Sequence, residues 1–181
     1  MRADARRNYE ALLAAARDLF QEQGPDAPLD EVAKRAGVGA GTLYRHFPTR
    51  NDLVAAVYVA DIDALCDAAE KLAAEDPDAA LGGYMDLHVG FTLRNAGIKK
   101  AIKEMLADGD TRPGLTLCKT RMTEIAGETL AHAQDAGAAR EDVDTVTFLR
   151  MLHGIALACE ENPEMAPAML EVMKAGLLRG A

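Results

Sequence analysis

Tryptophan is absent from this 181-residue chain, aromatic residues make up only 4% of it, and cysteine occurs three times. The cysteines, Cys66, Cys118 and Cys159, are odd in number and widely spaced, with no C-x-x-C pair. We therefore expect small buried thiols in a reducing compartment rather than a disulfide framework. Hydrophobic residues make up 49% of the chain, which is enough for a buried core, and the abundance of alanine, leucine and methionine favours helices.

Long apolar runs are also missing. No stretch approaches the length of a membrane span, and residues 1–7 carry charges of both signs, so we expect no signal peptide, no membrane contact and a cytoplasmic location. His88, Cys118, His153 and Cys159 have no spacing typical of metal ligands, and no nucleophile with a base or phosphate-binding loop stands out. The sequence thus predicts no metal, no cofactor, no catalytic residue and no enzyme.

The net charge of −9 is unevenly distributed along the chain. Residues 1–52 hold eight lysines and arginines against eight aspartates and glutamates, whereas the remainder holds twelve against twenty-one. Screening hides charges beyond roughly 10 Å, so attraction to DNA phosphates depends on the local surface and not on the total. A neutral N-terminal segment with arginine clusters is therefore compatible with nucleic-acid binding, and the acidic remainder is expected to face away from DNA.

Apolar residues recur with the period of an α-helix along most of the chain, and no segment alternates as a β-strand does. Glycine and proline separate these stretches, because glycine ends helices and proline cannot continue them. Gly82 and Gly83 lie inside an expected helix, which costs stability unless a neighbour or ligand approaches closely. The sequence predicts an all-α protein of about nine helices, among them 29–36, 40–47, 49–74, 141–160 and a last helix after Pro163.

The segment LDEVAKRAGVGAGTLYRHFPTRNDL, residues 29–53, consists of two short predicted helices around a glycine turn. Such a turn sets the helices at a steep angle, so that the second can enter the major groove of DNA. Leu43 and Phe47 lie four apart on its inward face, whereas Thr42, Arg45 and His46 share the outward face. Thr49 and Asp52 form an approximate capping box at the start of the following helix. The pattern predicts a helix-turn-helix.

The stretch AGVGAGTLYRHFPTRNDL resembles the signature of the TetR family of transcriptional regulators, A-G-V-x-x-G-T-L-Y-x-H-F-x-x-K-x-x-L. Arg50 takes the place of the usual lysine, which keeps the charge, and Gly39 stands where serine is common. The body is similar to the SbtR-like C-terminal group. The resemblance implies a helix-turn-helix domain at 1–52 and a helical ligand-binding and dimerisation domain at 53–181.

By the same resemblance, the protein is a repressor that binds a palindromic operator as a homodimer. The resemblance places Thr42, Tyr44, His46 and Arg50 at positions that contact DNA, mostly phosphates, and Ala40, Gly41 and Arg45 at positions that often face bases. Arg6 and Arg7 are expected to reach DNA from a flexible arm, although a solvated surface is an equal alternative.

Two features of the body are expectations from its apolar pattern. The eighth and ninth helices carry more apolar surface than one copy can hide, so two copies should pair through them, and aspartate at Leu152 or Leu177 should disrupt the pair. A small, neutral or weakly acidic, mostly apolar inducer should bind between the fifth and seventh helices, with His88 as donor, and the expected lining is Met85, His88, Phe91, Leu106, Cys118 and Met122. Methionines fill cores as readily as pockets, so a rigid dimerisation body without an inducer remains the alternative.

Overall fold

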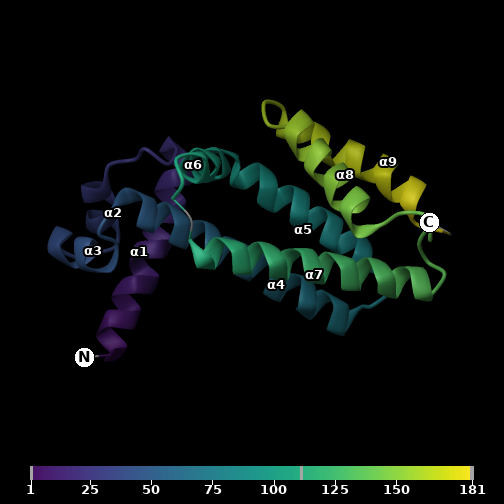
Figure 1. The fold of residues 1–181 in the computed structure, drawn as a ribbon, viewed down its shortest axis with the longest axis horizontal. Helices are drawn as coiled ribbons and strands as arrows, with labels where there is room; N and C mark the ends of the chain where they lie inside the picture. The colour runs from purple at the N-terminus through teal and green to yellow at the C-terminus, as the bar shows by residue number, and fades with distance from the viewer. Residues whose placement is uncertain (1, 111, 180–181) are drawn as a thin grey trace. The chain divides into compact units, whose positions relative to one another are not determined.

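The computed structural model describes residues 2–110 and 112–179, apart from the side chain of Arg2. In that part of the chain the fold is all-α with nine α-helices, as the periodicity predicts, and one short 3-10 helix, η1 (Figure 1). No helix there is long and apolar enough to cross a membrane. The elements are α1 (Arg2–Gln23), α2 (Leu29–Arg35), α3 (Ala40–His46), α4 (Arg50–Glu75), α5 (Ala80–Arg94), α6 (Ala96–Ala107), α7 (Pro113–Asp135), α8 (Thr145–Ala158), η1 (Pro163–Met165) and α9 (Ala166–Leu177).

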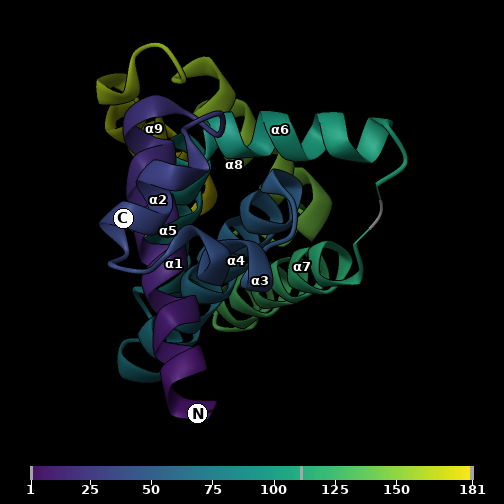
Figure 2. The ribbon, with the colours of Figure 1, turned by 90° about the vertical axis from the view of Figure 1, so that its left-hand side faces the viewer.

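The helices form two compact units. The first combines the chain up to Ala60 with Asn95–Leu115, and so contains α1, α2, α3, the start of α4 and α6. In Figure 2 the N-terminus lies below and α6 crosses the top of this unit, where it contacts α1. Although α6 was expected to belong to the body, it packs in the unit that holds the helix-turn-helix. The functional division after Asp52 remains a prediction, because packing units and functional domains need not coincide.

The second unit contains Asp61–Arg94 and the chain from Thr116 onward. Within it α8 and α9 pack against each other and against α5 (Figure 1). Tyr84 of α5 and Phe148 of α8 are fully buried, with ring centroids 5.9 Å apart. A Cβ atom added to Gly83 would lie 2.1 Å from Cδ2 of Leu72 on α4. Gly83 therefore does have a close neighbour, and that neighbour is another helix of the protein.

The start of α8 differs from the sequence-based expectation, which placed it at residue 141. The chain instead forms an isolated antiparallel bridge between Ala139 and Leu178, in which the Arg140 amide donates to the Leu177 carbonyl at 3.0 Å. The Asp144 side chain then accepts a hydrogen bond from the Thr147 amide at 2.6 Å and caps the helix. The periodicity of the apolar residues missed this boundary because the cap and the bridge depend on polar and backbone contacts.

Candidate nucleic-acid interface and ligand cavity

The turn between α2 and α3 has the geometry that the glycine pattern predicts. Gly37 adopts φ of +69°, a left-handed conformation that residues with a side chain rarely adopt. The following Val38 amide donates to the Ala33 carbonyl at 3.0 Å, which closes α2. Val32 and Leu43 are buried on the inner faces of the two short helices. The apolar contact and the glycine turn together fix α3 relative to α2.

The outer face of α3 presents most of the predicted DNA-contacting residues to solvent. Ala40, Gly41 and Arg45 are exposed, and 48% of Tyr44 is exposed, which is more than a core aromatic would show. Thr42 is half-buried. A hydroxyl, a phenol and a guanidinium thus lie along one short helix with small residues at its N-terminal end. This arrangement suits insertion into a groove, because the small residues let the backbone approach closely.

His46 is less free than its position in the sequence suggests. Its ring is half-buried, with its centroid 5.9 Å from that of Tyr9 on α1. Tyr9 also stacks on Phe47, with centroids 5.2 Å apart and ring planes 30° apart. These aromatic contacts hold the C-terminal end of α3 against α1. Sequence reasoning missed Tyr9, although it is one of only eight aromatic residues in the chain.

Arg50 has partners within the protein. Its Nη1 atom donates to the carbonyl oxygens of Pro25 and Ala27, at 3.0 and 2.6 Å. The guanidinium therefore holds the connection between α1 and α2 against the start of α4. Sequence reasoning did not foresee this contact, and the predicted phosphate contact of Arg50 remains a prediction.

Three further arginines of the first unit, Arg6, Arg7 and Arg35, make ion pairs on its surface. The expectation of a flexible N-terminal arm is wrong, because residues 2–23 form a continuous helix on which Arg6 pairs with Glu10 and Arg7 with Asp4. Arg35 of α2 binds both carboxylate oxygens of Glu22, at 2.7 and 2.9 Å. This hydrogen bonding lowers the pKa of the Glu22 carboxyl. The pair ties α2 to the end of α1.

The N-terminus of α4 carries a network centred on Asp52. One carboxylate oxygen accepts from the amide and the hydroxyl of Thr49, at 2.8 and 2.7 Å, which confirms the predicted capping box. The other accepts from Arg112, in the connection between α6 and α7, and Arg112 also pairs with Asp110 at 2.9 Å. Hydrogen bonds from Arg112 and then from Thr49 lower the pKa of the Asp52 carboxyl. Sequence reasoning missed Arg112, which lies 60 positions away.

We expect Asp52→Asn to lower the free energy of unfolding by about 1–2 kcal/mol at pH 7, because the charged cap and the ion pair with Arg112 are both weakened. A carboxyl whose pKa is lowered by folding stabilises the fold above its unfolded value of about 3.9, and this contribution is lost as the pH falls through the folded value. The difference between wild type and Asp52→Asn, measured by urea unfolding, should therefore shrink below about pH 4. Asp26→Asn, at an exposed loop position, is the control and should leave the free energy of unfolding nearly unchanged. If the difference between wild type and Asp52→Asn stays constant down to pH 2, the stabilising role of the Asp52 carboxylate is contradicted.

The residues predicted to line an inducer pocket separate into two groups. Met85, His88, Phe91 and Cys118 are buried in the second unit, where the Tyr84 hydroxyl lies 3.2 Å from Nδ1 of His88. The same hydroxyl donates to the backbone carbonyl of half-buried Met122 at 3.4 Å. Burial raises the pKa of the Tyr84 phenol. Leu106, by contrast, is half-buried on α6 in the first unit.

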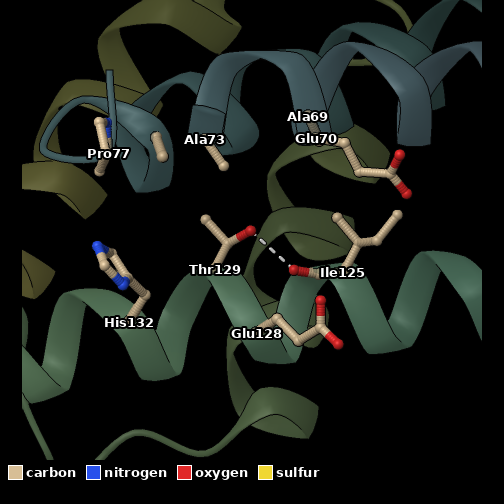
Figure 3. A pocket seen from close by; sticks show the side chains of 9 residues that line it. Ala69, Glu70, Ala73, Pro77, Ile125, Glu128, Thr129 and His132 are labelled. Carbon is tan, nitrogen blue, oxygen red and sulfur yellow. Dashed lines mark hydrogen bonds between the residues drawn. The ribbon is translucent and has the colours of Figure 1, made fainter. Parts of the chain in front are cut away.

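A cavity of about 300 Å³ lies in the second unit, between the C-terminal half of α4, the start of α5 and α7 (Figure 3). It opens to solvent, and its lining shares no residue with the predicted set. Alanines, a proline and an isoleucine form its apolar walls, and two carboxylates, a threonine and a histidine complete it. The lining residues are Ala69, Glu70, Ala73, Pro77, Ala80, Ile125, Glu128, Thr129 and His132.

An arginine of α7 connects to α4 beside this cavity. Arg121 pairs with Asp63 at 3.2 Å, with Asp67 at 2.6 Å and with Glu70 at 3.0 Å. Three carboxylates therefore share one guanidinium, and the neighbourhood of the cavity stays acidic.

Two family models match the chain. The model described as bacterial regulatory proteins, tetR family, matches residues 12–57, which include the helix-turn-helix. The model described as transcriptional regulator SbtR-like, C-terminal domain, matches residues 76–179.

Solved structures match over nearly the full length. A TetR transcriptional regulator from Streptomyces coelicolor is 31% identical with a TM-score of 0.80, over 95% of this chain and 99% of that one. A TetR transcription regulatory protein from Mycobacterium vanbaalenii is 34% identical with a TM-score of 0.73, over 98% and 99%. An HTH-type transcriptional regulator from Staphylococcus aureus is 41% identical over 64 residues, and this match spans only 35% of the length of each protein.

Proposed function

The chain belongs to the TetR family of bacterial regulatory proteins, DNA-binding transcriptional regulators that are not enzymes, and has an SbtR-like C-terminal domain; from this premise we propose that it is a homodimeric repressor, released from a palindromic operator by a small, largely apolar ligand. The observation that carries the proposal is the outer face of α3. It presents Tyr44 and Arg45 to solvent, while Leu43 and Phe47 anchor the helix in its unit.

In this proposal α3 lies in the major groove. Arg45 reads a base edge, for which a guanidinium can form two hydrogen bonds to guanine. Ala40 and Gly41 allow the backbone to approach the bases. Thr42, Tyr44, His46 and Arg50 contact phosphates, which position the protein but carry no sequence information.

Exposed apolar side chains support pairing through α8 and α9. In contrast to the sequence-based expectation, Leu152 and Leu177 are buried within a single copy, so aspartate there would disrupt the fold itself. Other positions expose large apolar side chains, which are costly to leave in water and suit a subunit interface. These are Val146, Met151 and Leu157 of α8, Met165 of η1 and Val172 of α9.

The cavity between α4, α5 and α7 supports a ligand-responsive body. Its volume of about 300 Å³ lies at the lower end of the range for small-molecule sites. The alternative, a regulator with a rigid dimerisation body and no inducer, is favoured by the methionines, of which Met85, Met105 and Met173 are buried as core residues. The two candidates differ in one measurable respect, since only the first loses DNA affinity on ligand addition.

We expect genome-wide mapping of bound DNA, followed by footprinting, to reveal a site with two-fold symmetry and half-site centres about one helical turn, roughly 34–36 Å, apart, or a multiple of it. A two-fold dimer with two α3 helices requires this symmetry. Unrelated DNA of the same length is the control. Protection of asymmetric sites, or equal affinity for both DNAs at moderate salt, would contradict the proposal.

A further inference from the structure

The cavity between α4, α5 and α7 combines apolar walls with two acidic side chains. Figure 3 shows Glu70 on α4 and Glu128 on α7 on one side of Thr129, with His132 on the other. The Thr129 hydroxyl is already used, since it donates to the Ile125 carbonyl at 2.7 Å. The polar side chains that remain for a ligand are therefore the two carboxylates of Glu70 and Glu128 and the imidazole of His132.

The charges around the cavity are not balanced. Arg121 binds Glu70, but it is also shared with Asp63 and Asp67. Within the residues that the structure describes, Glu128 has no hydrogen bond or ion pair, and neither has His132 one turn further along α7. Glu70 and Glu128 are both exposed, so neither carboxylate requires a cation from the protein, but each can accept a charge-assisted hydrogen bond from a cationic ligand that also covers the apolar wall.

We propose that this cavity binds a protonated primary or secondary amine attached to a small apolar body. The amine N–H groups donate to the carboxylates of Glu70 and Glu128, and the apolar part lies against Ala69, Ala73 and Ile125. This changes the sequence-based expectation of a neutral or weakly acidic ligand, which depended on His88 as the polar group. His88 is buried against Tyr84, and it does not line this cavity.

The lining also separates amines from other cations. It contains no phenylalanine, tyrosine or tryptophan, so it lacks the aromatic faces that bind quaternary ammonium groups. A quaternary group also has no N–H to donate to a carboxylate. The volume of about 300 Å³ lies at the lower end of the range for small-molecule sites, so the ligand is a small molecule.

Four probes with the same six-carbon chain test the proposal on the full-length protein: hexylamine, hexyltrimethylammonium, hexanol and hexanoate. Binding is followed through the methyl NMR signals of Ala73, Ile125 and Thr129 without DNA. We expect hexylamine to bind at least tenfold more tightly than the other three. Glu70→Gln and Glu128→Gln should each lower the affinity for hexylamine by about three- to tenfold. Glu124→Gln, on the same helix but outside the cavity, should leave binding unchanged.

Equal binding of hexylamine and hexanol would overturn the proposal. It would also be overturned if Glu124→Gln lost as much affinity for hexylamine as the two cavity variants, because that would show a general attraction of cations to an acidic protein. The inference rests on the proposed function only for its effect on DNA, which is measured separately as the operator affinity with and without hexylamine. If hexylamine fills the cavity and operator affinity is unchanged, the site stands and the proposed release fails. If another molecule releases DNA while hexylamine does not bind, the proposed function stands and the amine site fails.

Discussion

Val172→Asp is expected to convert the protein from dimers to monomers at micromolar concentration and to weaken operator binding at least a hundredfold. Val172 lies on α9 with 76% of its surface exposed, next in the chain to buried Met173. In the proposed dimer it is covered by the partner subunit, and an unpaired carboxylate there must lose its water without compensation. A dimer gains operator affinity because binding of one head raises the effective concentration of the other, a factor of about 10²–10⁴.

Sedimentation and DNA titration measure the two effects. Leu117→Asp is a matched control, because Leu117 is also largely exposed, at 69%, but lies on α7, outside α8 and α9; it should remain dimeric and bind operator normally. Leu152→Asp serves as the opposite control, because Leu152 is fully buried and the variant should fail to fold. If Val172→Asp stays dimeric while Leu117→Asp does not, the interface lies on α7 rather than α9.

Arg45→Ala is expected to weaken operator binding roughly 5- to 150-fold, with little loss on random DNA and a relaxed preference at one base pair in each half-site. The Arg45 side chain is exposed near the end of α3, where a guanidinium can bond a guanine edge twice. Because this contact discriminates between bases, its loss affects only DNA that carries the right base. Titration of operator and random DNA at several salt concentrations measures the effect.

Arg50→Ala is the comparison variant. Loss of a phosphate contact should lower the affinity for both DNAs by similar factors. It should also reduce the slope of affinity against salt concentration by the amount expected for about one phosphate contact. Its bonds to the carbonyls of Pro25 and Ala27 add a second effect, so the variant should also unfold at a lower temperature. Equal weakening of both DNAs by Arg45→Ala would reassign Arg45 to the DNA backbone, and specificity would then come from Thr42, from the backbone near Gly41 or from DNA shape.

The features that depend on local sequence could be predicted. The glycine turn at Gly37, the buried Leu43 and Phe47, the exposed Arg45 and the cap at Thr49 follow from helix periodicity and backbone preferences over a few residues. The family resemblance added the function of that face, which periodicity alone does not identify.

The features that sequence reasoning missed depend on contacts between distant positions. The partners of Arg50 and the ion pair of Arg112 with Asp52 join segments 23 to 60 positions apart. The cavity between α4, α5 and α7 was not foreseen for a related reason. Helical periodicity shows which side chains point inward, but not whether they touch one another. Met85 is simply buried, and the space opens instead beside Ala69 and Ala73, whose short side chains on α4 leave room opposite Thr129 of α7 (Figure 3).

The bridge between Ala139 and Leu178 closes a covalent segment that contains both α8 and α9. The amides of Arg140 and Arg179 donate across it, at 3.0 and 2.8 Å, although both side chains are exposed. Neither amide belongs to a helix, so their exchange with solvent deuterium does not report helix fraying. It reports the opening of the α8–α9 hairpin at its base. These two amides are therefore a built-in readout of the stability of the hairpin that carries the proposed subunit interface, independent of any DNA measurement.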